Sequence, residues 1–120
     1  MRNLKIVITK ILKQVYPDVF YESAHDDAPY PYLVYAFGSG FNNRHNEIIP
    51  LDVDIWDLNE SSQEIDEIMT ELKRLDGKCY TDEDMQFSLY YDRTLDTSPE
   101  DRNHKRMTVT FELRYHERRV

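Results

Sequence analysis

Apolar residues in the first part of the sequence recur at the spacing of one helix face. They are Leu4, Val7, Ile8, Ile11, Leu12 and Val15, each three or four positions from another member of the set. This repeat matches the period of an α-helix, so it predicts an amphipathic helix. Pro17 ends that helix, because proline cannot continue helical hydrogen bonding.

Three extended segments follow, and the middle one is apolar on both faces. Residues 19–22 form a short segment, and the next strand begins at Tyr32 within the stretch PYPYLVYAFGSGF, residues 29–41. Five of these thirteen residues are aromatic and none is charged. Alternate residues of a strand point to opposite faces. We therefore interpret this strand as buried on both faces, one of them by another subunit.

The third segment, residues 47–58, alternates between apolar and polar positions. Its residues Ile49, Leu51, Val53 and Ile55 point one way, and Asp52, Asp54 and Trp56 point the other way. A period of two predicts a half-buried strand. Pro50 lacks an amide proton, so we place it near the start of the strand or on a sheet edge.

A second helix and two further strands complete the pattern. Ser61 and Glu64 have the spacing of a capping box, and Gly77 stands where a left-handed helix cap is expected. The apolar stripe between them consists of Ile65, Ile68, Met69, Leu72 and Leu75. Alternation then predicts strands at residues 85–91 and 107–115, joined by a long charged loop at residues 94–105.

The predicted order is helix, three strands, helix and two strands (α-β-β-β-α-β-β), in a single domain of residues 1–120. Consecutive strands with short connections favour antiparallel pairing, so the fold class is α+β. We expect a mainly antiparallel sheet of four to five strands, with both helices packed on one face. Two helices cannot readily cover both faces of such a sheet.

Net charge and cysteine content narrow the range of functions and cellular compartments that we expect. The chain has 15 Lys and Arg against 23 Asp and Glu, a net charge of −8, and such a surface repels phosphate, which argues against sequence-independent nucleic-acid binding. Cys79 stands alone and cannot form an internal disulfide, which indicates a reducing compartment. Apolar runs are short and interrupted by lysine, so we expect neither a membrane span nor a signal peptide.

Asp52 and Asp54 are the strongest candidates for chemistry. On one strand face their Cα atoms lie roughly 7 Å apart, and two carboxylates can share a hard cation such as magnesium. A small metal-dependent hydrolase is therefore an alternative, although solubility alone also explains alternating aspartates. The histidines lack metal-ligand spacing and no glycine-rich phosphate loop occurs. We expect no enzyme, no catalytic or metal site and no cofactor.

The aromatic residues carry more information about function. The sequence contains 9 tyrosines, and tyrosine is favoured at interfaces because its ring packs while its hydroxyl hydrogen-bonds. Tyr32, Val34 and Trp56 lie opposite the main apolar pattern, so we predict that they form a subunit interface, with cover by another part of the same chain as the alternative. A further alternative is an acidic binding or inhibitory module, although the carboxylates are spread over helix, strands and loops.

The order of these motifs resembles one protein family. A proline-led strand ends in Val34 and Tyr35 (PYPYLVYAF), and a strand closing on Trp56 runs into an acidic helix that ends in Leu-Asp-Gly at Gly77 (IPLDVDIWDLNESSQEIDEIMTELKRLDG). The terminal strand reads TVTFELRYHE. Together with the first helix, this arrangement is similar across nearly the whole chain to the tail terminator and tail-completion proteins of long-tailed bacteriophages, also called tail-to-head joining proteins.

The resemblance implies a structural protein of a phage or prophage virion. Its copies would form a homo-oligomeric ring, a hexamer, that caps the tail tube and docks it to the head connector at the tail–head interface, after assembly in the bacterial host cytoplasm. The tail-tube protein and a head-completion or neck protein would be its partners, and DNA would pass through the lumen without specific binding. Loops would grip adjacent rings through Phe41, Asn42, Asn43, Arg44, Thr94, Asp96, Arg102 and Lys105.

Overall fold

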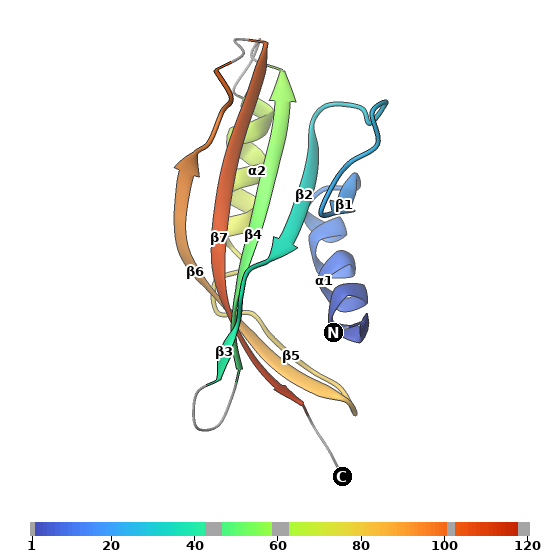
Figure 1. The fold of residues 1–120 in the computed structure, drawn as a ribbon, viewed down its shortest axis with the longest axis vertical. Coiled ribbons are helices and arrows are strands. Elements are labelled where there is room, and N and C mark those ends of the chain that lie inside the picture. The colour runs from blue at the N-terminus through green and yellow to red at the C-terminus, as the bar shows by residue number, and fades with distance from the viewer. Residues whose placement is uncertain (1, 43–46, 59–62, 101–102, 118–120) are drawn as a thin grey trace.

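The computed structural model describes residues 2–42, 47–58, 63–100 and 103–117, which contain two helices and seven strands. In chain order these are α1 (Arg2–Val15), β1 (Val19–Tyr21), β2 (Tyr32–Phe37), β3 (Phe41–Asn42), β4 (Glu47–Leu58), α2 (Gln63–Lys73), β5 (Cys79–Thr81), β6 (Met85–Asp96) and β7 (His104–Glu117). The molecule measures 51 × 23 × 23 Å. It is elongated because the three long strands β4, β7 and β6 lie side by side (Figure 1).

The strands form one mixed sheet. Six of them follow the order β1-β2-β4-β7-β6-β5, and β3 pairs with β4 off this path. β1 runs parallel to β2, whereas the other pairs are antiparallel. The α+β class is confirmed, but the expected sheet of four to five strands is wrong, because the sheet is larger, and it is mixed because β1 pairs with β2 in parallel. β3 and β5 have two and three residues, which is too few for an alternating pattern to reveal.

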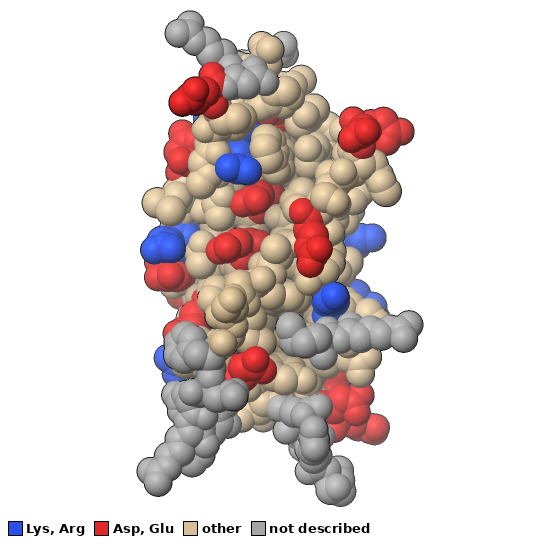
Figure 2. Space-filling view, viewed as in Figure 1, with Lys and Arg blue, Asp and Glu red and all other residues tan. Residues whose placement is uncertain are grey.

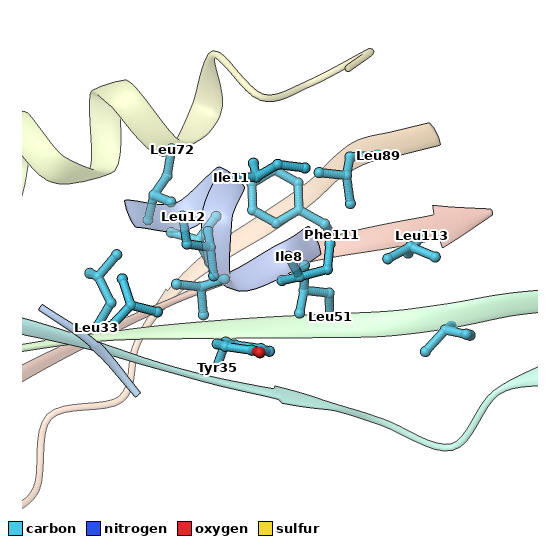
Figure 3. Packing of buried hydrophobic residues seen from close by; sticks show 14 of the residues in the cluster. Ile8, Ile11, Leu12, Leu33, Tyr35, Leu51, Leu72, Leu89, Phe111 and Leu113 are labelled. Atoms are coloured by element: carbon cyan, nitrogen blue, oxygen red, sulfur yellow. The ribbon is translucent and has the colours of Figure 1, made fainter. Parts of the chain in front are cut away.

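Both helices pack on one face of the sheet. α1 contacts β1, α2 contacts β4 and β7, and the two helices touch each other. The core beneath them consists of the apolar helix stripes and the inward-facing strand residues, including Ile8, Leu12, Leu33, Leu51, Leu72 and Phe111 (Figure 3). The predicted helix stripes are therefore the buried faces, and among the described residues no helix lies on the other face of the sheet.

Pro50 is the fourth residue of β4, near the start of the strand as expected. Its carbonyl accepts a hydrogen bond from the Gly38 amide at 2.8 Å. The amide and carbonyl of one residue in an antiparallel strand point to the same neighbour, so the missing proton faces the segment just after β2 ends. Gly38 allows this approach, because a Cβ atom there would lie 3.1 Å from Pro50 Cβ.

α2 ends at Lys73, and residues 74–77 form a turn after it. Gly77 has the left-handed conformation predicted for it, with a φ of 82°, but it lies four residues beyond the helix and does not cap it directly. Its amide donates to the Leu89 carbonyl at 2.7 Å, which ties the turn to β6. Ser61, predicted to cap the start of this helix, lies outside the described residues.

The strands β6 and β7 extend into the region predicted as a charged loop. Thr94 and Asp96 belong to β6 and Lys105 belongs to β7, so their assignment to a loop is wrong. The reason is a bulge between Tyr91 and Arg93 that shifts the register. One extra residue reverses the alternation of faces, so the sequence pattern breaks off although the strand continues. Phe41 and Asn42 likewise form β3 in place of the predicted loop.

Candidate functional site: the open sheet face

The face of the sheet opposite the helices has no layer above it in the described part of the chain. Tyr32 and Trp56 are direct cross-strand partners on this face, and Val34 pairs with Asp54. Tyr32 and Trp56 are half-buried, while Val34 is only 8% exposed because its neighbours surround it. We call this surface the open sheet face and define it by Phe20, Tyr32, Val34, Asp52, Asp54, Trp56, Tyr90, Arg106, Thr108, Thr110 and Arg114.

Aromatic rings form a continuous row at one end of the open sheet face. The Tyr32 ring packs edge-on against Phe20, with centroids 5.8 Å apart, and lies 5.2 Å from Tyr30. Tyr30 in turn lies 5.6 Å from the ring of His104 in β7. Burial, with a contribution from Tyr30, raises the pKa of Tyr32, so its hydroxyl stays neutral. The row presents aromatic area with polar tips, a composition favoured at protein interfaces.

Two arginines lie over aromatic rings of the same face. The Arg106 guanidinium lies 4.9 Å from the Trp56 ring, and that of Arg114 lies 5.1 Å from the Tyr90 ring. Arg106 Nε also donates to the Thr97 carbonyl at 3.0 Å, which holds the side chain in place. Each pair is a cation–π contact, so the exposed edges of these rings are already fixed in orientation.

Asp52 and Asp54 point to the open sheet face, as the alternation predicts. Thr110 donates its hydroxyl to Asp52 Oδ1 at 2.8 Å, and Thr108 donates to Asp54 Oδ1 at 2.6 Å. Among the described residues, no group of three or more His, Cys, Asp or Glu side chains is arranged to hold a metal ion. Figure 2 shows acidic groups set within a largely uncharged surface. Both carboxylates thus take part in a cross-strand ladder with β7.

A shallow hollow of about 330 Å³ lies on this face beside the β6 bulge. Ile48, Pro50, Tyr90 and Phe111 supply apolar walls, and Thr110 and Glu112 supply polar atoms. The bulge bends β6 away from its neighbour locally, which opens the space. The hollow makes the face uneven, so a side chain of a partner protein could insert there.

The predicted inter-ring residues fall at two ends of the molecule. Phe41 and Asn42 pair with the start of β4, whereas Lys105 pairs with Asp57 near its end. Thr94 and Asp96 lie near Lys105, at the end of β6. Asn43, Arg44 and Arg102 lie outside the described residues. The structure therefore does not bring the two sets together, because most of the length of β4 separates them.

Several residues of the open sheet face were not singled out from the sequence. Phe20, Tyr90, Arg106 and Arg114 join it because sheet order and register place β1 beside β2, β7 beside β4 and β6 beside β7. Strand alternation assigns each side chain to one of two faces. It does not reveal which strands are neighbours, and the cation–π pairs depend on that.

No described helix is long and apolar enough to cross a membrane.

Comparisons with known proteins give a fold likeness and no family. No family model matches the chain, and no curated protein matches it. Among solved structures, the chain is similar to one from the virion of a native gene transfer agent (GTA) particle. The TM-score is 0.56 at 11% identity, over 89% of this chain and 84% of that chain. At this identity the likeness shows a shared fold, so the α+β subunit described above resembles a chain of that particle.

Proposed function

We propose that the chain is the structural subunit of a tail terminator, or tail-to-head joining protein, of a phage or prophage. Identical copies form a ring, a hexamer as in the family that the sequence resembles, which caps the tail tube and docks it to the head connector. The observation that carries this proposal is the open sheet face. An aromatic surface that the chain's own helices leave uncovered is typical of a protein–protein contact.

The chemistry of this face supports contact better than catalysis. Tyr32 and Trp56 supply rigid aromatic area, and Arg106 fixes the Trp56 ring from one side. Asp52 and Asp54 are hydrogen-bonded to threonines of β7. The threonine hydroxyls give both carboxylates a hydrogen-bonding role in the sheet surface. A structural role therefore explains the two aspartates without a catalytic reaction at this face.

The shape of the subunit supports a ring with two different faces. The two sets of inter-ring residues lie at opposite ends of a molecule 51 Å long. Copies arranged side by side would present Phe41 and Asn42 on one face of the ring, and Thr94, Asp96 and Lys105 on the other. One face would meet the tail-tube protein and the other the neck protein. A net charge of −8 per chain suits a lumen that lets DNA pass without holding it.

The fold likeness supports a virion location. The solved neighbour is a chain of a virion particle, and a similar fold fits a building block of such a particle. The position at the tail–head interface, the tail-tube and neck partners, and assembly in the host cytoplasm are the finer parts of the proposal. They rest on the sequence resemblance.

Electron microscopy of the purified protein, alone and mixed with purified tail tubes, tests the proposal. We expect rings with a central hole, free or at one end of each tube, and tubes without the protein serve as the control. A protein that stays monomeric alone and leaves the tubes bare would contradict it.

A further inference from the structure

A groove on the helical side of the molecule is separate from the open sheet face. It has a volume of about 280 Å³ and lies between the end of α1 and α2. Val15, Tyr16 and Ile68 supply its apolar lining, and Glu64, Glu67 and Glu71 form its rim. Burial, followed by the charge of Glu64, raises the pKa of Tyr16, in keeping with the negative rim. The groove thus combines an apolar floor with an acidic edge, and we call it the acidic groove.

The opposite side of α1 carries a complementary row. Ile6, Lys10 and Lys13 are four and three residues apart, so they share one helix face, and all three are exposed. Ile6 is 48% exposed although it is a large aliphatic residue. Leu4, Ile8 and Ile11 cover the other side of α1 and are buried. The outward row therefore combines one apolar side chain with two positive charges.

The row and the groove match in length as well as in charge. Ile6 to Lys13 and Glu64 to Glu71 each cover seven residue steps, which is roughly 10 Å along a helix. Within the described residues, neither Lys10 nor Lys13 has an ion-pair partner. On the rim, Glu71 pairs with Arg74 at 3.1 Å, and that pair is exposed and weak. The two lysines are thus free to meet an opposite charge, and the weak pair on the rim lets Glu71 exchange its partner.

We propose that the outward row of α1 in one copy docks into the acidic groove of a neighbouring copy. Ile6 seats against the apolar floor, and Lys10 and Lys13 reach the rim glutamates. Because the row and the groove are different surfaces of one chain, two bound copies together still offer one free row and one free groove, and such head-to-tail contacts close into rings. This inference rests on the proposed ring and names a contact that is independent of the open sheet face.

Zero-length carbodiimide cross-linking tests this contact directly, because it joins lysine to carboxylate only at contact distance. A mixture of ¹⁵N-labelled and unlabelled protein separates links between copies from links within a copy. We expect mass spectrometry to find mixed-isotope links from Lys10 or Lys13 to Glu64, Glu67 or Glu71. Those links should fade as salt rises, since exposed charge pairs are screened.

A charge-reversal series supplies the quantitative test. Lys10→Glu should raise the dissociation constant of self-association about tenfold, while Lys78→Glu, an exposed lysine away from the row, makes the same charge change and should alter it little. The exchange variant Lys10→Glu with Glu67→Lys should recover most of the loss. All variants should melt at similar temperatures, because none of these side chains is buried.

The outcomes separate this inference from the function beneath it. Oligomers whose cross-links exclude the row and the groove, or that respond alike to Lys10→Glu and Lys78→Glu, would overturn the docking contact and leave the ring proposal standing. A chain that stays monomeric at every concentration, with and without tail tubes, would overturn both.

Discussion

Tyr32 and Trp56 stand directly opposite each other on β2 and β4, on the face that neither helix covers. Cross-strand partners of this kind have Cβ atoms about 5 Å apart, so the two side chains act as one surface. Arg106 lies over the Trp56 ring, and Phe20 and Tyr30 flank Tyr32. The pair is thus the centre of an aromatic patch whose geometry is set by contacts within the chain, without a bound partner.

Truncating this pair should weaken assembly and leave the fold intact. Tyr32→Ser with Trp56→Ser removes aromatic area that packs at the contact, and losing one such anchor costs about 2 kcal/mol, or about thirtyfold in the dissociation constant. Analytical ultracentrifugation should show a shift toward monomer. Tyr32→Phe, which keeps the ring, should assemble like the wild type. Equal assembly of the serine variant would remove this face from the ring contact.

Divalent metal ions should leave the midpoint temperature of thermal unfolding unchanged. Asp52 and Asp54 each accept a threonine hydroxyl, and we assign them to the sheet surface. A cation that bound only the folded state would raise the midpoint in proportion to the logarithm of its concentration. Scanning calorimetry with and without millimolar magnesium or manganese decides the matter, with Asp52→Asn as the control variant. A metal-dependent rise that Asp52→Asn abolishes would revive the hydrolase alternative.

The hydroxyl of Tyr35 fastens α1 to the sheet. It lies 2.7 Å from Thr9 Oγ1 and donates to the Lys5 carbonyl at 3.1 Å, and burial raises the pKa of Tyr35, so the group stays neutral. Tyr35→Phe should lower the free energy of unfolding by about 1 kcal/mol, measured by urea denaturation. In a Thr9→Val background the same change should cost less, because one partner is already gone. Fully additive losses would show that the two hydroxyls do not interact.

Gly38 and Gly77 are needed for different reasons. At Gly38 a Cβ atom would press on Pro50 Cβ at 3.1 Å, so Gly38→Ala should destabilise by about 1–2 kcal/mol. At Gly77 nothing lies within 4 Å, but φ is 82°, so Gly77→Ala should cost about 1 kcal/mol. Asparagine tolerates left-handed backbone. Gly77→Asn should therefore recover part of the stability lost in Gly77→Ala, whereas Gly38→Asn should recover none of the stability lost in Gly38→Ala. Recovery at both positions would contradict the steric account of Gly38.

The sequence predicts the helices and the inward strand faces well, because period alone determines both. Leu4, Ile8 and Leu72 are buried as the helical repeats require, and Gly77 has the expected backbone conformation. The predicted interface residues Tyr32, Val34 and Trp56 share one face because each sits at an alternate strand position. Their role in assembly remains a prediction.

Other features depend on which strands and helices become neighbours, and the pattern within a single segment does not show this. β3 and β5 are too short to show a period, and the bulge after Tyr91 reverses the alternation and hides the end of β6. Arg106 meets Trp56 only because β7 pairs with β4 in one register. The acidic groove requires α1 and α2 to pack together although some sixty residues separate their starts. These features follow from strand order and helix packing.

Trp56 is the single tryptophan of the chain, so its fluorescence reports on the open sheet face alone. We would measure its emission maximum and the molar mass by light scattering over the same range of protein concentration. If copies cover this face, the emission should shift to shorter wavelength over the concentrations at which the mass rises above the 14.4 kDa of one chain. An unchanged emission maximum while the mass rises, or a single-chain mass throughout, would contradict the claim that the open sheet face is an assembly surface.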